Sequence, residues 1–114
     1  LYKTEAFELC RYINRDKEII PWHTINKPPS AELRPNQQDT DSLPDYPVLD
    51  AILYQHIELS KSAEEIIEQG FDEVVVNKVV RMVYRNDFKR FQLAPVLAIS
   101  PKPFAMREMP IVKE

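Results

Sequence analysis

The chain has 114 residues, with 18 acidic and 15 basic side chains, a net charge of −3, one cysteine, one glycine and ten prolines. This length predicts one compact domain with a modest core. A single cysteine excludes an internal disulfide framework, a single glycine excludes glycine-rich phosphate loops, and the negative charge argues against a protein that coats nucleic acid. The longest uncharged apolar stretch, residues 93–99, is too short to span a bilayer, so we expect no membrane segment.

The first 15 residues predict a helix with one apolar face. The apolar side chains recur at helical spacing at Ala6, Leu9, Cys10 and Ile13. Thr4 is the expected N-cap, and Cys10 is interpreted as a small buried hydrophobe, because no histidine or cationic cluster near it in sequence would activate a thiol. The chain begins at Leu1 and enters this helix directly, so we expect it to be a piece of a longer chain.

Residues 16–47 interrupt the helical pattern and contain six of the ten prolines. Prolines fix φ and remove backbone donors, so we expect no regular element here except a short extended piece at Glu18–Ile20. A loop of this length is either a disordered linker or a functional segment. Apolar anchors favour the functional segment, because linkers seldom keep such residues: Trp22, Ile25, Leu33 and Leu43.

Polar side chains on this loop offer two kinds of chemistry. Lys27 and Ser30 are suited to holding phosphate oxygens, although Ser30 is equally a candidate helix cap and we favour that simpler role. Asp39, Asp41 and Asp45 offer hard oxygen ligands for a divalent cation, but they lack the spacing of a dedicated site and suit a solvated loop. His23 and His56 lie far apart, so we assign no metal ligand in this chain.

Residues 48–92 predict a helical hairpin region. Its first apolar stripe comprises Leu49, Ile52, Leu53 and His56, and we interpret the histidine as a half-buried helix residue rather than a ligand. Ser62 and Glu65 form a capping box before a short helix that should end at Gly70. Asp72 should cap the next helix, whose valines recur at helical spacing at positions 76, 79, 80 and 83.

Basic side chains follow along this last helix, at Arg81, Arg85, Lys89 and Arg90. They suit either a solvated face that complements the helix dipole or an anion site, in which Phe88 and Phe91 place rings beside cations. Residues 62–81 also fit a helix–turn–helix module. We favour an ordinary hairpin, because the acidic side chains of the first helix would repel nucleic-acid phosphates. The predicted fold is all-α, with three or four helices and a long proline-rich loop, followed by an extended tail over residues 93–114.

Several motifs occur in a specific order along the whole chain. They are LYKTE at residues 1–5, PSAELRP at 29–35, DSLPDY at 41–46, GFD at 70–72, NDFKR at 86–90 and AP at 94–95. In this order the set resembles the C-terminal part of bacterial NAD synthetases, of the glutamine-dependent branch. The resemblance implies an origin in an adenine-nucleotide α-hydrolase-like α/β synthetase domain, of which residues 1–114 would be the C-terminal segment.

That family uses ATP and magnesium to adenylate deamido-NAD, and ammonia then displaces AMP to give NAD. The resemblance implies that Lys3 and Ser30 contact ATP phosphates, Ser30 in place of a threonine, and that Lys89 contacts deamido-NAD. Phe88 takes the position of a histidine in ammonia-dependent relatives and belongs to the same deamido-NAD site. The segment 16–47 would be the loop that covers the substrates.

The family's glycine-rich pyrophosphate loop and magnesium-binding glutamate have no counterpart in this sequence. We therefore assign no catalytic residue and expect the segment alone to be inactive, with the remainder of a synthetase chain as its partner. The resemblance further implies a cytoplasmic, self-associating enzyme. The rival hypotheses are a helix–turn–helix module that binds nucleic acid and a helical protein-interaction domain.

Overall fold

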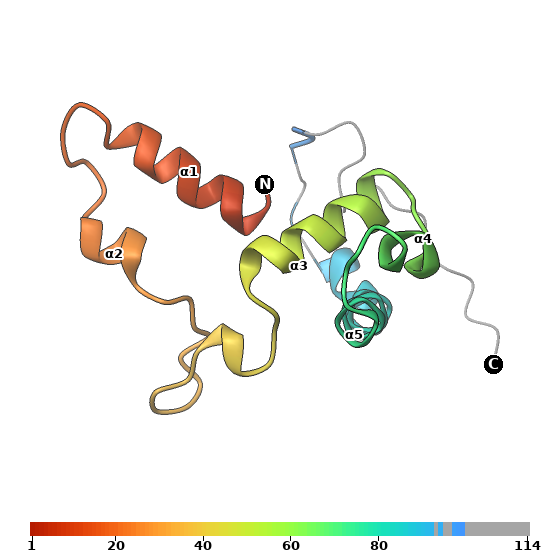
Figure 1. Cartoon of the computed structure of the whole chain (residues 1–114). Helices are drawn as coiled ribbons and strands as arrows, with labels where there is room; N and C mark the ends of the chain where they lie inside the picture. Colours follow the sequence, from red (N-terminus) through yellow and green to blue (C-terminus); the bar gives the residue numbers. More distant parts are fainter. Residues whose placement is uncertain (93, 95–96, 100–114) are drawn as a thin grey trace. The chain divides into compact units, whose positions relative to one another are not determined.

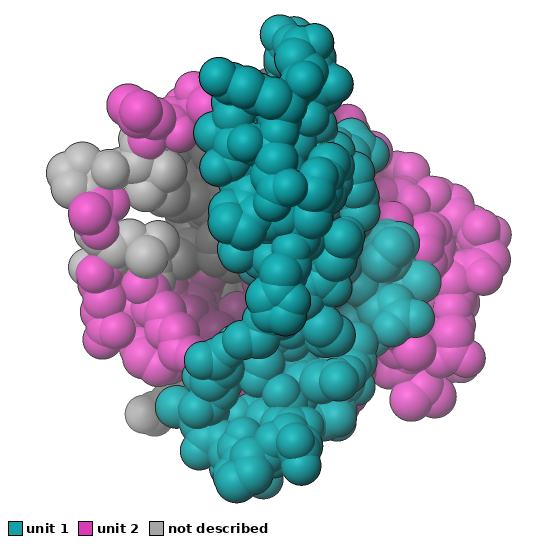
Figure 2. All heavy atoms as spheres, turned by 90° about the vertical axis from the view of Figure 1, so that its left-hand side faces the viewer, with its two compact units in different colours: residues 1–50 teal, residues 51–114 magenta. Residues whose placement is uncertain are grey.

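The computed structural model describes residues 1–92, 94 and 97–99, with the backbone alone at 90 and 91. The chain divides into two compact units, residues 1–50 (unit 1) and residues 51–114 (unit 2), rather than the one compact domain expected from its length (Figure 2). The described residues form helices and turns without a strand, which confirms the all-α prediction for this part of the chain. The expected tail at 93–114 lies largely outside the described residues.

Eight helical elements follow one another along the described part of the chain (Figure 1). Five are α-helices: α1 (Lys3–Ile13), α2 (Trp22–Asn26), α3 (Tyr46–Leu53), α4 (Ala63–Ile67) and α5 (Glu73–Arg85). Three are shorter or differently wound: the 3₁₀ turn η1 (Asp39–Asp41), the π-helix η2 (Tyr54–Glu58) and the 3₁₀ turn η3 (Asp87–Gln92). None of the described helices is long and apolar enough to cross a membrane.

The N-terminus of α1 differs from the prediction. The helix begins at Lys3, its N-cap is Tyr2, and Thr4 is already inside the first turn. Side chains satisfy the amides at this end, because the Tyr2 N–H donates to the Glu5 carboxylate within the helix at 2.8 Å and the Thr4 N–H donates to the Asp50 carboxylate at 2.8 Å. The prediction of Thr4 as N-cap was therefore wrong.

The predicted apolar face of α1 is not a buried face. No residue of α1 is buried; Leu9 is 46% exposed and Cys10 is half-buried. Amphipathic spacing specifies which side chains share a face but not what covers that face. The interpretation of Cys10 as a buried hydrophobe was wrong for this structure.

Residues after α1 are held by one buried polar side chain. The Asn14 amide accepts N–H groups from Ile19 (3.0 Å) and Ile20 (2.9 Å) and donates to the Ile20 carbonyl at 2.7 Å. Asn14 is only 5% exposed, so these three bonds replace water for the turn. The predicted extended piece at Glu18–Ile20 is instead this turn, because its amides bond to a side chain rather than to a neighbouring strand.

The long loop contains one buried anchor. Ile25, on the short helix α2, is 5% exposed, and Leu43 is half-buried. Trp22 and Leu33 are exposed, which corrects the prediction that they too are anchors. The segment 16–47 thus has two short elements, α2 and η1, that proline counting did not reveal.

Unit 2 has a small aliphatic core in which α4 packs against α5. The Ser62 hydroxyl accepts the Glu65 N–H (3.3 Å) and the Glu65 carboxylate accepts the Ser62 N–H (2.8 Å), which confirms the capping box. Gly70 has the predicted left-handed backbone, with φ +98°, but α4 ends earlier than predicted, at Ile67 with Glu68 as its C-cap. The Asp72 carboxylate accepts the Val75 N–H at 2.9 Å, which confirms the predicted cap of α5. The core side chains are nearly all aliphatic: Ile52, Ile57, Ile66, Val76, Val79 and Val83.

The helix that begins as α3 changes its winding at η2. The Leu59 N–H bonds to the Tyr54 carbonyl, five residues earlier, at 3.2 Å. This wider turn buries Ile57 after Ile52, a spacing of five that a regular α-helix does not give. His56 lies in the same turn and is half-buried, as predicted, with Nδ1 3.0 Å from the Lys61 carbonyl oxygen.

Candidate functional site

The four side chains assigned to binding lie in two units. Lys3 and Ser30 belong to unit 1, and Phe88 and Lys89 belong to unit 2.

Lys3 is the first residue of α1, and two aromatic rings flank its ammonium group. Nζ lies 5.7 Å from the ring centroid of Phe7 and 5.9 Å from that of Tyr46. Phe7 follows Lys3 by four residues, so both project from the same side of the helix. A cation within about 6 Å of a ring is attracted by roughly 0.5–1 kcal/mol at an exposed site. The rings therefore restrict where the ammonium can lie while leaving it open to a ligand.

Tyr46 is the first residue of α3 and is tied to the end of the loop. Its hydroxyl donates a short hydrogen bond to the Asp39 carboxylate. Partial burial, together with this bond and the nearby charges of Asp39 and Asp50, raises the pKa of Tyr46 to about 12. The phenol is therefore a persistent donor at neutral pH. Sequence reasoning missed Tyr46, because only the fold brings α3 beside Lys3.

Asp50 joins the beginning of α1 to α3. It is buried, and its carboxylate accepts the Thr4 N–H at 2.8 Å. A carboxylate at a helix N-terminus interacts favourably with the helix dipole as well as with the orphan amide. This contact fixes the turn from which Lys3 projects.

Ser30 lies on the loop outside any helix. Its Oγ accepts the Glu32 N–H at 3.0 Å, a local turn in which the hydroxyl hydrogen can still be donated elsewhere. The simpler interpretation of Ser30 as a helix cap was wrong, because no helix follows it before η1.

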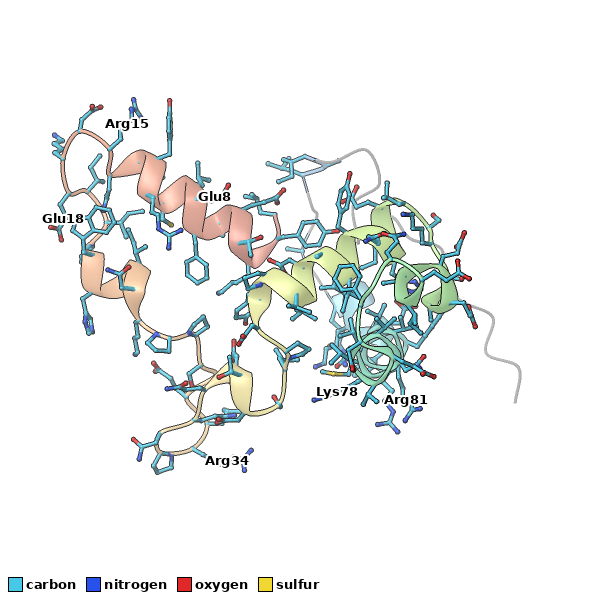
Figure 3. The ribbon with its side chains drawn as sticks, viewed as in Figure 1. Glu8, Arg15, Glu18, Arg34, Lys78 and Arg81 are labelled. Atoms are coloured by element: carbon cyan, nitrogen blue, oxygen red, sulfur yellow. The ribbon has the colours of Figure 1, made fainter. Side chains whose placement is uncertain are left out.

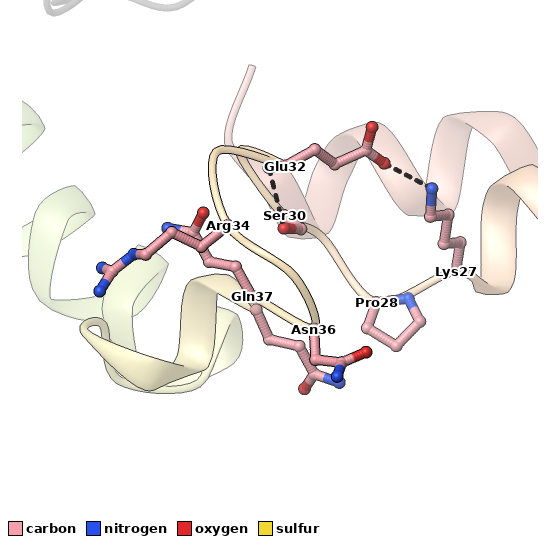
Figure 4. A pocket seen from close by; sticks show the side chains of 8 residues that line it. Lys27, Pro28, Ser30, Glu32, Arg34, Asn36 and Gln37 are labelled. Carbon is pink, nitrogen blue, oxygen red and sulfur yellow. Dashed lines mark hydrogen bonds and ion pairs between the residues drawn. The ribbon is translucent and has the colours of Figure 1, made fainter.

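A hollow of about 270 Å³ lies beside Ser30 on the loop (Figure 4). The residues that line it are polar or charged apart from Pro28, and they include Lys27, Glu32, Arg34, Asn36 and Gln37. Lys27 forms an exposed ion pair with Glu32 at 2.5 Å, and that hydrogen bond lowers the pKa of the Glu32 carboxyl. The pairing leaves Arg34 as the cation of this hollow without a carboxylate partner among the described contacts.

The loop around this hollow is sharply turned. Glu32 has φ +54° and Asn36 has φ +55°, in the left-handed region that non-glycine residues seldom adopt. Such conformations are kept where surrounding contacts impose them. Here the Gln37 side chain accepts the Leu33 N–H at 3.0 Å, and the Asp39 N–H donates to the Pro29 carbonyl at 2.9 Å.

Two of the three loop aspartates considered for a cation have structural partners. Asp39 accepts the Tyr46 hydroxyl, and Asp41 accepts the Gln38 N–H at 2.9 Å. No group of three histidine, cysteine or carboxylate side chains that could hold a metal occurs among residues 1–92. Asp39 and Asp41 therefore close the loop locally.

Phe88 and Lys89 lie in η3, after α5 has ended at Arg85. Both are exposed, Phe88 by 52%, and the Lys89 N–H donates to the Asn86 carbonyl at 3.0 Å. The predicted single helical row through Lys89 is wrong, because the 3₁₀ turn changes the spacing. The side chains of Arg90 and Phe91, which complete that prediction, lie outside the described residues.

The basic side chains of α5 are exposed on its outer side, where Lys78 and Arg81 project from the helix (Figure 3). With Arg85 and Met82 they line a hollow of about 560 Å³. Arg85 lies in the last turn, where a cation complements the helix dipole. The preceding helix α4 has only five residues and exposes Glu64 and Glu65. This geometry favours an ordinary helical hairpin over a helix–turn–helix module that binds nucleic acid.

Comparisons with known proteins show which family the chain belongs to. The NAD synthase family model matches residues 1–93. The chain belongs to the NAD synthase family. It is 49% identical over 112 residues to a glutamine-dependent NAD(+) synthetase of Synechocystis and 52% identical over 115 residues to that of Acinetobacter baylyi. These alignments cover 97% and 98% of the chain.

A solved structure gives a similar result. Glutamine-dependent NAD+ synthetase from Acinetobacter baumannii, in complex with ADP, is 40% identical over 97% of the chain, with a TM-score of 0.58. The chain spans about a fifth of the length of these relatives: 20% and 21% of the two sequences and 19% of the solved chain. The relatives are therefore much longer than this chain.

Proposed function

We propose that this chain is the C-terminal segment of a glutamine-dependent NAD synthetase. The reaction would be the ATP-dependent amidation of deamido-NAD to NAD, through an adenylate and with ammonia derived from glutamine. The observation that carries the proposal is family membership over residues 1–93. The resemblance further implies that Lys3 and Ser30 take the family's ATP positions. The ADP complex of the Acinetobacter baumannii relative supports a nucleotide ligand.

In this proposal Lys3 and Ser30 bind the phosphates of ATP. Attack of a carboxylate on the α-phosphorus develops negative charge on phosphoryl oxygens. A positioned ammonium and a hydroxyl donor stabilise that charge more than they stabilise the substrate. The contacts of Lys3 with Phe7 and Tyr46 support this role, because they hold a charge in place without neutralising it.

The loop from 26 to 46 would cover the bound substrates. Exclusion of water protects an acyl-adenylate from hydrolysis, and segments that close over a site commonly provide it. Left-handed residues and local hydrogen bonds shape the loop, and its hollow offers Ser30 and Arg34. The adenine-nucleotide α-hydrolase-like origin of the domain is part of the same proposal.

Lys89 and Phe88 would contact deamido-NAD. An exposed ammonium suits the dinucleotide's phosphates, and an exposed ring suits stacking on one of its bases. Their place on η3 leaves both side chains accessible.

The described residues do not fit a magnesium site. Magnesium prefers carboxylate oxygens in octahedral geometry, and the loop carboxylates Asp39 and Asp41 are engaged in local hydrogen bonds. We derive no step through the metal from this chain. The remainder of the synthetase chain would supply the metal site, the pyrophosphate loop and the glutaminase, and self-association would follow the family.

The test uses the full-length protein that contains this chain. Lys3→Ala should raise the KM for ATP, whereas the exposed Lys17→Ala should behave as the wild type. Lys89→Ala should raise the KM for deamido-NAD and leave that for ATP unchanged, with Lys78→Ala as its control. Formation of NAD by residues 1–114 alone, or normal kinetics in both test variants, would contradict the proposal.

A further inference from the structure

The two side chains assigned to ATP phosphates are connected by a continuous path of contacts within unit 1. The path begins at Lys3, whose Nζ lies 5.9 Å from the ring of Tyr46. The Tyr46 hydroxyl donates to the Asp39 carboxylate, and the Asp39 N–H donates to the Pro29 carbonyl at 2.9 Å. Pro29 immediately precedes Ser30.

We propose that Tyr46 is a positioning residue that couples Lys3 on α1 to Ser30 on the loop. Its ring is one wall beside the Lys3 ammonium, and its hydroxyl holds the residue that fixes the peptide before Ser30. This inference rests on the proposed function of the site.

Each hydrogen bond in the path fixes the orientation of the groups that it joins. The Pro29–Ser30 peptide is planar, so a hydrogen bond to the Pro29 carbonyl orients the whole unit from which Ser30 projects. Asp39 makes two contacts at once, through its backbone to Pro29 and through its carboxylate to Tyr46. A phenol bonded to a carboxylate is a charge-assisted pair, which is stronger and more restrictive than a neutral one.

The beginning of α1 is held against the same helix as Tyr46. Asp50 lies four residues after Tyr46 on α3, and its carboxylate accepts the Thr4 N–H beside Lys3. The backbone at Lys3 and the ring of Tyr46 therefore keep a fixed spacing through α3. A shift of the loop that moves Asp39 would be transmitted to the Lys3 ammonium by the Tyr46 ring.

Steady-state kinetics of the full-length protein test this coupling. Tyr46→Phe keeps the ring but removes the hydroxyl, and should raise the KM for ATP by about 2- to 10-fold, the range of one net hydrogen bond. Asp39→Asn should have a similar effect, and the KM for deamido-NAD should not change with either variant. Tyr12→Phe is the matched control, because Tyr12 lies on α1 with an exposed side chain.

A double-mutant cycle separates positioning from general loosening. Lys3→Ala and Ser30→Ala should be non-additive for the KM of ATP in the wild-type background, and additive when Tyr46→Phe is also present. Additivity in both backgrounds, or Tyr46→Phe kinetics equal to those of Tyr12→Phe, would overturn the inference while the proposed function stands. Absence of synthetase activity in the wild-type protein would overturn the proposed function and the inference together.

An activity-independent measurement tests the first link. The Lys3 methylene protons should show an upfield ring-current shift by NMR that Tyr46→Phe retains and Tyr46→Leu reduces. An equal shift in the Tyr46→Leu variant would show that the ring does not flank Lys3.

Discussion

In unit 2, six aliphatic side chains are buried among the described residues, whereas unit 1 buries only Ile25 and Leu49 among its apolar residues. Unit 1 buries as many polar side chains, Asn14 and Asp50, and both accept backbone N–H groups, whereas unit 2 adds only Asp87 to its aliphatic core. The stabilisation from apolar burial does not depend on direction, whereas a hydrogen bond weakens when its distance or angle changes. The unit that carries Lys3 and Ser30 therefore depends on a few specific polar side chains.

The largest expected loss of stability comes from a substitution in the aliphatic core of unit 2. Ile66→Ala removes a side chain with no exposed surface from between α4 and α5, and should destabilise unit 2 by about 2–5 kcal/mol. Native-state hydrogen exchange of the α4 and α5 amides measures this. Val74→Ala, at an exposed position of α5, should change exchange little; equal effects of the two variants would contradict a core at Ile66.

The next largest loss of stability is expected when a buried polar side chain of unit 1 is removed. Asn14→Ala leaves the Ile19 and Ile20 amides without their acceptor and should cost about 1–3 kcal/mol in local opening. Exchange of those two amides should accelerate, and exchange in α5 should not. The control is Asn26→Ala, at an exposed position. If this variant accelerated exchange of the Ile19 and Ile20 amides equally, Asn14 would not be what protects them.

A smaller loss of stability is expected from backbone strain at Gly70, in the turn between α4 and α5. Gly70 has φ +98° and open space where a Cβ would lie, so Gly70→Ala should cost about 1–2 kcal/mol through backbone strain alone. Gly70→Asn should cost less, because asparagine visits this conformation more readily. Thermal unfolding of the two variants checks the order, and the reverse order would exclude a conformational cause.

The smallest effect is a titration in unit 1. The folded pKa of Tyr46, about 12, lies above the ordinary value near 10. The corresponding stability is therefore fully present below pH 10 and is lost as the pH rises through about 12. The absorbance at 295 nm of the wild type minus that of Tyr46→Phe isolates this phenol, and Asp39→Asn should shift its transition to lower pH. A transition near 10 in the difference curve would contradict the hydrogen bond between Tyr46 and Asp39.

The contrast between the units also explains what sequence reasoning achieved. The capping box at Ser62, the turn at Gly70 and the valine stripe of α5 were predicted correctly, because each depends on residues within one or two turns. The Tyr46–Asp39 and Thr4–Asp50 contacts were missed, because they join residues that only the fold brings together. The α1 stripe misled for a related reason: periodicity does not say whether a face finds a partner.

The candidate site follows the same division. Lys3, Ser30, Phe88 and Lys89 were chosen by resemblance, and their roles remain predictions. Phe7 could have been placed beside Lys3 from i, i+4 spacing alone, whereas Tyr46 could not. The basic row failed at Lys89 because a 3₁₀ turn follows α5.

The π-helix between Tyr54 and Glu58 has a consequence for chain length. A turn closed over five residues holds one residue more than an α-helical turn of the same rise. Deletion of one residue within it should let α3 continue as regular helix to Leu59 while Ile52 and the following core isoleucine stay on one face. We therefore expect this chain to tolerate a single-residue deletion at this point, whereas the same deletion inside α5 would rotate its valines out of the core.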